Sequence, residues 1–287
     1  MSARELVVLA LQASIIVTVF GFGLRATTAD VMYVFKRPGL LLRSVLAMFV
    51  VMPVVAVVLA QAFDFRHPVE AALVALSISP IPPLLPRRHD KAGGQVSYGL
   101  GLMVTMALLS IVFIPLGVHL INMFYGKTFA ISSAVIAKIV FTAAVLPLLA
   151  GMLCNHFVPK LAHAIAKPAI LAGKVLLPLA GIAVLVAAHR ALGALLGDGT
   201  LVAIVVFVAI ALLVGHLLGG PEPEEREVLA LSTACRHPGI AIALASANAA
   251  SADDHQVPAA IMLYFVVSII ATVPYVKWQA KRLAAGR

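Results

Sequence analysis

The sequence predicts an all-α protein that crosses a membrane about nine times. Hydrophobic residues make up 62% of the 287 residues and charged residues only 11%, whereas a soluble domain carries about 25% charged residues. The hydrophobic residues gather in runs long enough for membrane-spanning helices, which need about 20 residues each. Two of these runs are interrupted by proline and glycine, and such a pair of interruptions is typical of the binding site of a secondary transporter.

Nine apolar segments follow one another along the chain, separated by short loops. The predicted segments are Leu6–Leu24, Leu40–Ala60, Val69–Pro86, Val96–Met123, Ile131–Leu153, Pro168–Ala188, Leu201–Leu218, Val228–Ala250 and Pro258–Val276. The third and the eighth contain the interruptions, and the fourth, fifth and sixth each contain an internal proline. Because no soluble domain or long linker separates the segments, we expect a single transmembrane domain over residues 1–287.

The third segment is interrupted by a run of prolines. Its break contains Ser77, Ser79, Pro80, Pro82, Pro83 and Pro86. Proline has no N–H and clashes with the preceding turn, so the helix cannot continue through this run. Non-helical backbone is tolerated at membrane depth only where it is buried in protein or lines a water-filled cavity. The sequence therefore predicts that this break belongs to a functional site.

The eighth segment contains a second break with the same lead-in, Ala-Leu-Ser. This break contains Ser232, Arg236, His237, Pro238 and Gly239. The serines of the two lead-ins lie 155 residues apart (232 − 77). An odd number of steps separates the third from the eighth segment, so the two cross the membrane in opposite directions. An inverted repeat has this property, and we expect one repeat over approximately residues 1–125 and the other over approximately residues 126–287.

Lysine and arginine are distributed unequally between the two predicted sides of the membrane. The loops after odd-numbered segments and the C-terminal tail hold Arg25, Lys36, Arg37, Arg43, Arg87, Arg88, Lys91, Lys160, Lys167, Arg226, Lys277, Lys281, Arg282 and Arg287, whereas the other side holds Arg4, Arg66, Lys127 and Arg190. Basic loops stay in the cytoplasm. We expect a multi-pass inner-membrane protein with its N-terminus outside and its C-terminus in the cytoplasm, and no nucleic-acid partner despite the net charge of +9.

A series of short motifs resembles the bile acid:sodium symporter family. The motifs are Phe20-Gly21-Phe22-Gly23-Leu24, Lys36-Arg37-Pro38, Met52-Pro53, Ser79-Pro80, Ala92-Gly93-Gly94-Gln95-Val96, Ser110 through Pro115, and Leu229-Ala230-Leu231-Ser232 through Gly239-Ile240-Ala241. Their order and spacing carry the resemblance. It implies a core domain with two crossing discontinuous helices, a separate panel domain, and alternating access with the substrate between the two domains.

The chain departs from the family pattern where the resemblance implies sodium ligands. The corresponding positions hold Met48, Leu85, Pro86, Gly99, Met103, Ser232, Ala234, Arg236 and His237. Hard cations need several oxygen ligands, which methionine and leucine side chains lack. Arg236 would also repel a sodium ion, at a cost of about 4 kcal/mol for charges 4 Å apart at an effective dielectric constant of 20. We therefore predict that sodium does not drive transport, and we expect no metal site and no cofactor.

Arg236 admits two hypotheses, because a charge at membrane depth is costly and usually functional. Its planar guanidinium could bind a carboxylate or phosphate of the substrate. Alternatively, it could occupy the vacated sodium site and tie the crossing helices together through backbone carbonyls. His237 could take part in proton coupling or could be a neutral side chain bonded to the open backbone. Arg87, Arg88 and His89 could draw anions to the cytoplasmic mouth or could simply anchor the loop.

The function expected from these residues is secondary transport of a small organic anion or amphipathic acid across the lipid bilayer. The sequence has no HExxH or GxSxG motif and no paired intramembrane carboxylates, so an enzyme is not expected. Two alternatives stay open: a membrane sensor or scaffold of the same fold that does not transport, and a sodium-dependent symporter with an unrecognised ion site. The sequence does not decide the substrate, the coupling ion or the oligomeric state.

Overall fold

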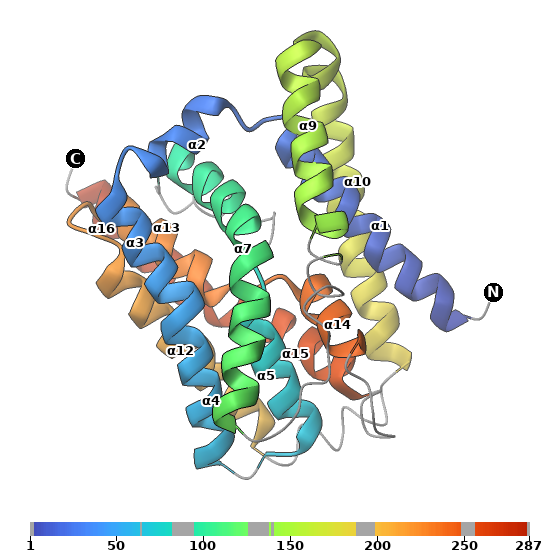
Figure 1. Cartoon of the computed structure of the whole chain (residues 1–287), viewed down its shortest axis with the longest axis vertical. Helices are drawn as coiled ribbons and strands as arrows, with labels where there is room; N and C mark the ends of the chain where they lie inside the picture. The colour runs from blue at the N-terminus through green and yellow to red at the C-terminus, as the bar shows by residue number, and fades with distance from the viewer. Residues whose placement is uncertain are drawn as a thin grey trace.

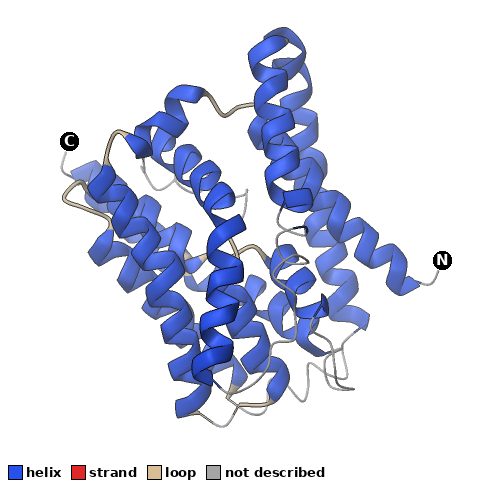
Figure 2. Cartoon of the chain, viewed as in Figure 1, coloured by secondary structure: helices blue, strands red, loops and turns tan. Residues whose placement is uncertain are grey.

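The computed structural model describes residues 3–63, 65–81, 95–125, 138, 141–187, 199–247 and 256–285. In this described part every regular element is a helix, and Figure 2 shows helices joined by short connections. The helices are α1 (Ala3–Gly23), α2 (Thr28–Phe35), α3 (Pro38–Val45), η1 (Leu46–Val51), α4 (Met52–Ala62), α5 (His67–Ile78), α7 (Val96–Tyr125), η2 (Phe141–Val145), α9 (Leu146–Phe157), α10 (Pro159–Ala187), α12 (Thr200–Leu218), α13 (Pro223–Ala234), α14 (Pro238–Ala247), α15 (Val257–Ala271) and α16 (Val273–Ala285).

Helices α1, α9 and α10 pack against one another and form a group at one side of the molecule (Figure 1). Close packing within this group depends on glycine. A Cβ on Gly23 of α1 would meet the backbone of Leu148 and Gly151 in α9, and a Cβ on Gly151 would meet the backbone of Phe20 and Gly23. The two helix backbones therefore lie in direct contact. We call α1, α9 and α10 the three-helix group.

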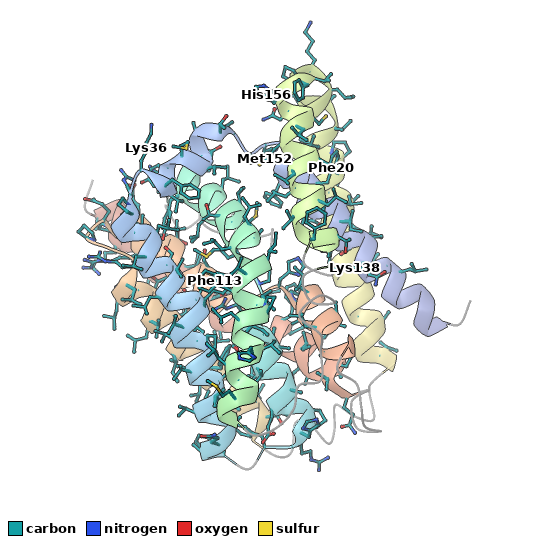
Figure 3. All side chains as sticks on the ribbon, viewed as in Figure 1. Phe20, Lys36, Phe113, Lys138, Met152 and His156 are labelled. Atoms are coloured by element: carbon teal, nitrogen blue, oxygen red, sulfur yellow. The ribbon has the colours of Figure 1, made fainter. Side chains whose placement is uncertain are left out.

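The other helices form a larger body around two buried hydrophobic clusters. Its largest buried cluster joins α4, α5, α12, α14 and α15, and includes Leu76, Phe207 and Tyr264. Helix α7 packs on the second span through Phe113, which is labelled in Figure 3 and stacks on Phe49 with ring centroids 4.9 Å apart. This body contains both predicted breaks.

The helix pairs α4–α5 and α12–α13 correspond at the same 155-residue offset as the two breaks. Pro68 and Glu70 in the first turn of α5 correspond to Pro223 and Glu225 in the first turn of α13. Proline is suited to a first helical turn, where its missing N–H has no intrahelical partner to lose. Both glutamates are buried and lie where the helix dipole favours a negative charge. Both broken helices therefore begin with a proline and a buried glutamate in the first turn.

Several polar stretches that were expected to be loops are helical. The loop predicted to hold Lys160 and Lys167 forms the first turns of α10, and the acidic stretch before the eighth segment forms the first turn of α13. Apolar runs do not predict these turns, because a helix satisfies its own backbone whether or not its side chains are apolar. Helix α2 was also missed. It is short and begins with a capping box between Thr27 and Asp30.

Five helices among the described residues are long and apolar enough to cross a membrane, or six if α1 and α2, which meet at 87°, count as one bent span. Helix α5 has only 12 residues, because the chain breaks at Ser79. The predicted total of nine spans also depends on residues 82–94, 126–137 and 188–198, which lie outside the described part. The coarser prediction, an all-helical protein with several membrane spans, is confirmed.

The basic segments predicted to share one side of the membrane lie at one end of the molecule. Four contacts join them: Arg37 to Glu225 at 2.9 Å, Asn155 Nδ2 to Ala26 O at 3.3 Å, Gln95 N to Glu224 O at 3.4 Å, and Gln279 Nε2 to Pro223 O at 2.9 Å. In Figure 3 the labelled Lys36 and His156 both lie at this upper end. The helix directions are therefore compatible with the predicted alternation of loops.

Candidate functional site

The two predicted breaks meet each other in the larger body. Helix α5 ends at Ile78, and Ser79 continues in an extended conformation. Helix α13 ends at Ala234. The chain becomes helical again in α14, whose first residue is Pro238. The backbone N–H of His237 donates to the carbonyl oxygen of Pro80 at 2.9 Å. One break therefore satisfies part of the open backbone of the other.

Arg236 lies at this crossing and joins three separate stretches of chain. Its side chain donates from Nε to Thr233 O, from Nη1 to Ser79 O and from Nη2 to Met48 O, each at 3.1 Å. The residue is 1% exposed. Each of the three guanidinium nitrogens thus has a backbone carbonyl as its partner, and the three carbonyls belong to α13, to the end of α5 and to the π-helix η1.

The sequence explains why these three carbonyls are free to accept. In the π-helix η1 the N–H of Met52 donates to Ala47 O, five residues back. In that register the donor for Met48 O would come from residue 53, which is a proline without an N–H. The helical donors for Ser79 O would come from residues 82 and 83, which are also prolines. The N–H that would serve Thr233 O belongs to His237 and is bonded to Pro80 instead.

The remaining polar groups at the crossing have separate roles. Tyr264 donates its hydroxyl to Ala234 O at 2.6 Å, which satisfies another carbonyl at the end of α13. The hydroxyls of Ser77 and Ser79 donate to Val74 O and Leu76 O in their own helix, at 2.7 and 2.9 Å. Ser232 is buried, and its hydroxyl has no hydrogen-bond partner among the described residues.

His237 borders a small cavity between the three-helix group and the crossing. The cavity has a volume of about 20 Å³, which is enough for one water molecule. Val19 and Leu148 line it from the three-helix group, and Met103 lines it from α7. Pro80 and His237 line it from the two breaks. The cavity therefore lies where the two helix groups face each other.

The predicted site residues are only partly covered by the described chain. Pro82, Pro83, Pro86, Arg87, Arg88 and His89 lie outside it. The described residues Arg236, His237, Ser79, Pro80 and Pro238 come together at the crossing, with Gly239 packed against Ile15 of α1. Among the described residues, no group of three or more His, Cys, Asp or Glu side chains is placed to hold a metal ion.

Sequence reasoning placed Thr233 within the second break without giving it a role, did not identify Tyr264, and noted Met48 only as a missing ligand. Met48 and Thr233 contribute their carbonyl oxygens, so side-chain chemistry gives no signal for them. One signal was available for Met48, because Pro53 in an apolar helix removes a donor from the turn before it. Tyr264 is a polar side chain within an apolar segment and needs a partner when it is buried.

A second polar cluster lies at the end of the molecule that holds the basic segments. Glu225 accepts hydrogen bonds from Arg37 and from the hydroxyl of Tyr33, both at 2.9 Å. The Arg37 guanidinium also lies 4.0 Å from the centre of the Tyr33 ring. The Arg37 side chain is 48% exposed, whereas that of Glu225 is 9% exposed. The cluster fastens the stretch around α2 to the start of α13.

We expect Glu225→Ala to lower the thermal stability of the purified protein more than Arg37→Ala does. A half-exposed ion-pair partner contributes at most about 1 kcal/mol, so the arginine variant should unfold close to the wild-type temperature. The glutamate variant leaves the part-buried hydroxyl of Tyr33 without its acceptor. It also removes a carboxylate from the first turn of α13, where the helix dipole contributes about 0.3–1 kcal/mol. Thermal unfolding in detergent measures both, with Lys36→Ala as the matched surface control. Equal effects of the two substitutions would contradict this account.

Comparison with known families identifies one match. Residues 13–194 match the model of the Sodium Bile acid symporter family. The matched range includes α9, α10, most of α1, the first break and α7, and it ends before α12, α13 and α14. Arg236 and His237 therefore lie beyond the matched range. Comparison with curated proteins finds no match.

Proposed function

Because this chain belongs to the sodium bile acid symporter family, we propose that it is a secondary transporter of small organic anions or amphipathic acids that works by alternating access. In this proposal the three-helix group is the panel domain, and the larger body with the two breaks is the core domain. The small cavity lined by Val19 and Leu148 on one side and by Pro80 and His237 on the other supports this division. Rocking of one domain against the other opens this cavity to either side of the membrane.

The charge of Arg236 is the observation that favours an anionic substrate. All three of its hydrogen bonds go to neutral carbonyl groups, so no bonded carboxylate cancels its charge. A buried charge is screened far less than one on the surface. The crossing therefore has a positive potential beside the cavity, which favours a negatively charged substrate.

The same contacts support transport without sodium. Met48 and Met103 are buried and bring thioethers, not oxygens, to the places where the family resemblance implies ligands. The guanidinium of Arg236 bonds the carbonyl oxygens that could otherwise attract a cation. In our proposal Arg236 is a built-in replacement for the ion, and its direct use as a substrate ligand is the less supported of the two hypotheses. The coupling is then proton symport, exchange or uniport.

The proposed arrangement in the membrane follows the distribution of basic residues. The end of the molecule that carries Lys36, Arg37, His156 and the start of α13 faces the cytoplasm, and the C-terminal helix α16 joins it through Gln279. The protein is one transmembrane domain over residues 1–287, with repeats over approximately residues 1–125 and 126–287. The common start of α5 and α13 supports the repeats. Its location is the inner membrane.

We expect the thermal stability of the purified protein to be the same in sodium chloride and in potassium chloride of equal concentration. Occupied binding sites stabilise a protein by about 2.7 kcal/mol at a ligand concentration 100 times Kd, so a functional sodium site would be visible. A sodium-specific rise in the unfolding temperature would contradict the proposal and favour an unrecognised ion site.

The proposed activity is tested by uptake of radiolabelled acids into proteoliposomes without a sodium gradient. Cholate, octanoate and benzoate cover amphipathic and small carboxylates. Uptake that does not respond to added sodium supports the proposal. If an acid stabilises the protein in detergent but no uptake follows, the alternative of a membrane sensor is favoured. If no acid stabilises the protein or enters the vesicles, the proposed substrate class is wrong.

A further inference from the structure

The two ring nitrogens of His237 have different surroundings. Nδ1 accepts a hydrogen bond from the backbone N–H of Ile240 at 3.4 Å, in the first turn of α14. A nitrogen that accepts this bond carries no proton. In the neutral ring the proton is therefore on Nε2, so the helix that follows the second break selects the tautomer of the histidine.

The ring also has physical reasons to stay neutral. A proton on Nδ1 would remove the acceptor that caps Ile240 N–H. It would also place a second positive charge next to Arg236 in sequence, within the same buried crossing. Both residues are almost completely buried, at 1% and 2% exposure. His237 is consequently a fixed hydrogen-bond donor through Nε2–H and is poorly suited to exchange protons.

The Nε2–H group is buried and has no hydrogen-bond partner among the described residues. Buried polar groups are nearly always satisfied, so an unsatisfied one calls for an explanation such as a ligand or water. His237 lines the small cavity between the three-helix group and the crossing. The other side chains that line this cavity are apolar, from Val19, Pro80, Ile81, Met103, Ala107, Leu148 and Ile240. A molecule held there would find one donor in an apolar wall.

We propose that His237 Nε2–H donates a hydrogen bond to an acceptor oxygen of the transported acid. This inference rests on the proposed function and deepens it, because it names the residue and the atom that recognise the substrate. At about 20 Å³ the cavity holds one water-sized group, so the donor meets the substrate after the three-helix group has moved away from the crossing. A carboxylate oxygen satisfies the donor, and the apolar walls accept the hydrocarbon part of the acid.

Two substitutions separate the two nitrogens of the ring. In His237→Asn the amide oxygen takes the position of Nδ1 and can still cap Ile240 N–H, but no donor reaches into the cavity. In His237→Gln the amide nitrogen takes the position of Nε2, so the donor is kept and the cap is lost. The asparagine variant should therefore fold like the wild type and bind acids poorly. The glutamine variant should bind acids and unfold at a lower temperature.

The experiment measures the dissociation constants of potassium cholate and potassium octanoate from thermal-shift titrations of the full-length protein in detergent. We expect His237→Asn to raise Kd about tenfold or more, since hydrogen bonds to charged groups are among the stronger ones, and His237→Gln to stay within about threefold of the wild type. Ala107→Val, which narrows the cavity without touching the histidine, should also raise Kd.

The possible outcomes are distinct. If His237→Asn binds the acids as the wild type does, Nε2 holds only water and the inference is wrong. If His237→Asn does not fold, unchanged acid binding by Ala107→Val, or a large loss of binding by the folded His237→Gln, overturns it. If neither acid stabilises the wild type, the proposed substrate class fails together with the inference. That result is recognised in the wild type alone, before any variant is compared.

Discussion

Replacing Arg236 with alanine is expected to cause the largest loss of stability of any single substitution at the crossing. The substitution removes the donors of Met48 O, Ser79 O and Thr233 O together. An unsatisfied buried carbonyl costs about 1–3 kcal/mol, and a whole domain is stable by only about 5–15 kcal/mol. We expect most of the variant protein to aggregate in detergent extracts, and fluorescence-detected size exclusion with thermal unfolding measures this.

Two further measurements test whether the lost stability comes from the missing guanidinium: the substitution Arg236→Lys and the addition of free guanidinium to Arg236→Ala. Lysine has a compact charge and no planar fork, so it can satisfy fewer of the three carbonyls and should restore only part of the stability. Millimolar guanidinium should raise the unfolding temperature of Arg236→Ala and leave that of the wild type unchanged. Stabilisation of Arg236→Ala by sodium and not by potassium would show directly that the arginine replaces an ion.

The opposite result would favour the other hypothesis for this residue. If Arg236→Ala unfolds at the wild-type temperature but no longer binds acids, the guanidinium is a substrate ligand and its carbonyl contacts contribute little. Arg37→Ala is the matched control, because it removes a guanidinium that is half exposed and pairs with the carboxylate of Glu225. We expect Arg37→Ala to lower the stability only slightly. A large loss in Arg236→Ala alone would then be due to the buried hydrogen bonds and not to the removal of an arginine as such.

Gly151→Leu is expected to have the second-largest effect, by forcing α9 away from α1. A Cβ at this position would already overlap the backbone of Phe20 and Gly23, and backbone cannot move aside as a flexible side chain can. In lipid, helices associate mainly through close packing at small residues, so the three-helix group should separate. We expect little folded protein, and no uptake by any that is recovered, measured by size exclusion and in proteoliposomes.

Gly39→Ala is the control for the loss of a glycine. A Cβ on Gly39 would have no neighbour within 4 Å, and alanine is favoured over glycine within a helix by about 0.5–1 kcal/mol. This variant should unfold at the wild-type temperature or slightly above it. If Gly151→Leu gives as much folded protein as Gly39→Ala, the contact between α1 and α9 is not essential, and the three-helix group does not act as one rigid domain.

Much of the local architecture was predictable from single residues. The ends of α5 and α13 were predicted at the breaks, because proline removes a backbone donor wherever it stands and no tertiary contact restores it. The second, fourth and seventh apolar segments were predicted within a few residues of the observed helices, because a bilayer demands about 20 apolar residues in a row. The polar first turns of α10 and α13 were missed, because a helix that leaves the bilayer no longer has to be apolar.

The sequence by itself determined that open backbone and an arginine occur together at membrane depth. Only the tertiary structure decided which carbonyls the arginine satisfies, since Met48 lies 188 residues away from it along the chain. The same holds for His237, because it lines a cavity together with residues of α1, α7 and α9. Missing N–H groups and apolar runs are properties of short stretches of chain. The partners of a buried charge depend on how distant helices cross. The sequence does not single them out, because every residue has a backbone carbonyl that could accept the hydrogen bond.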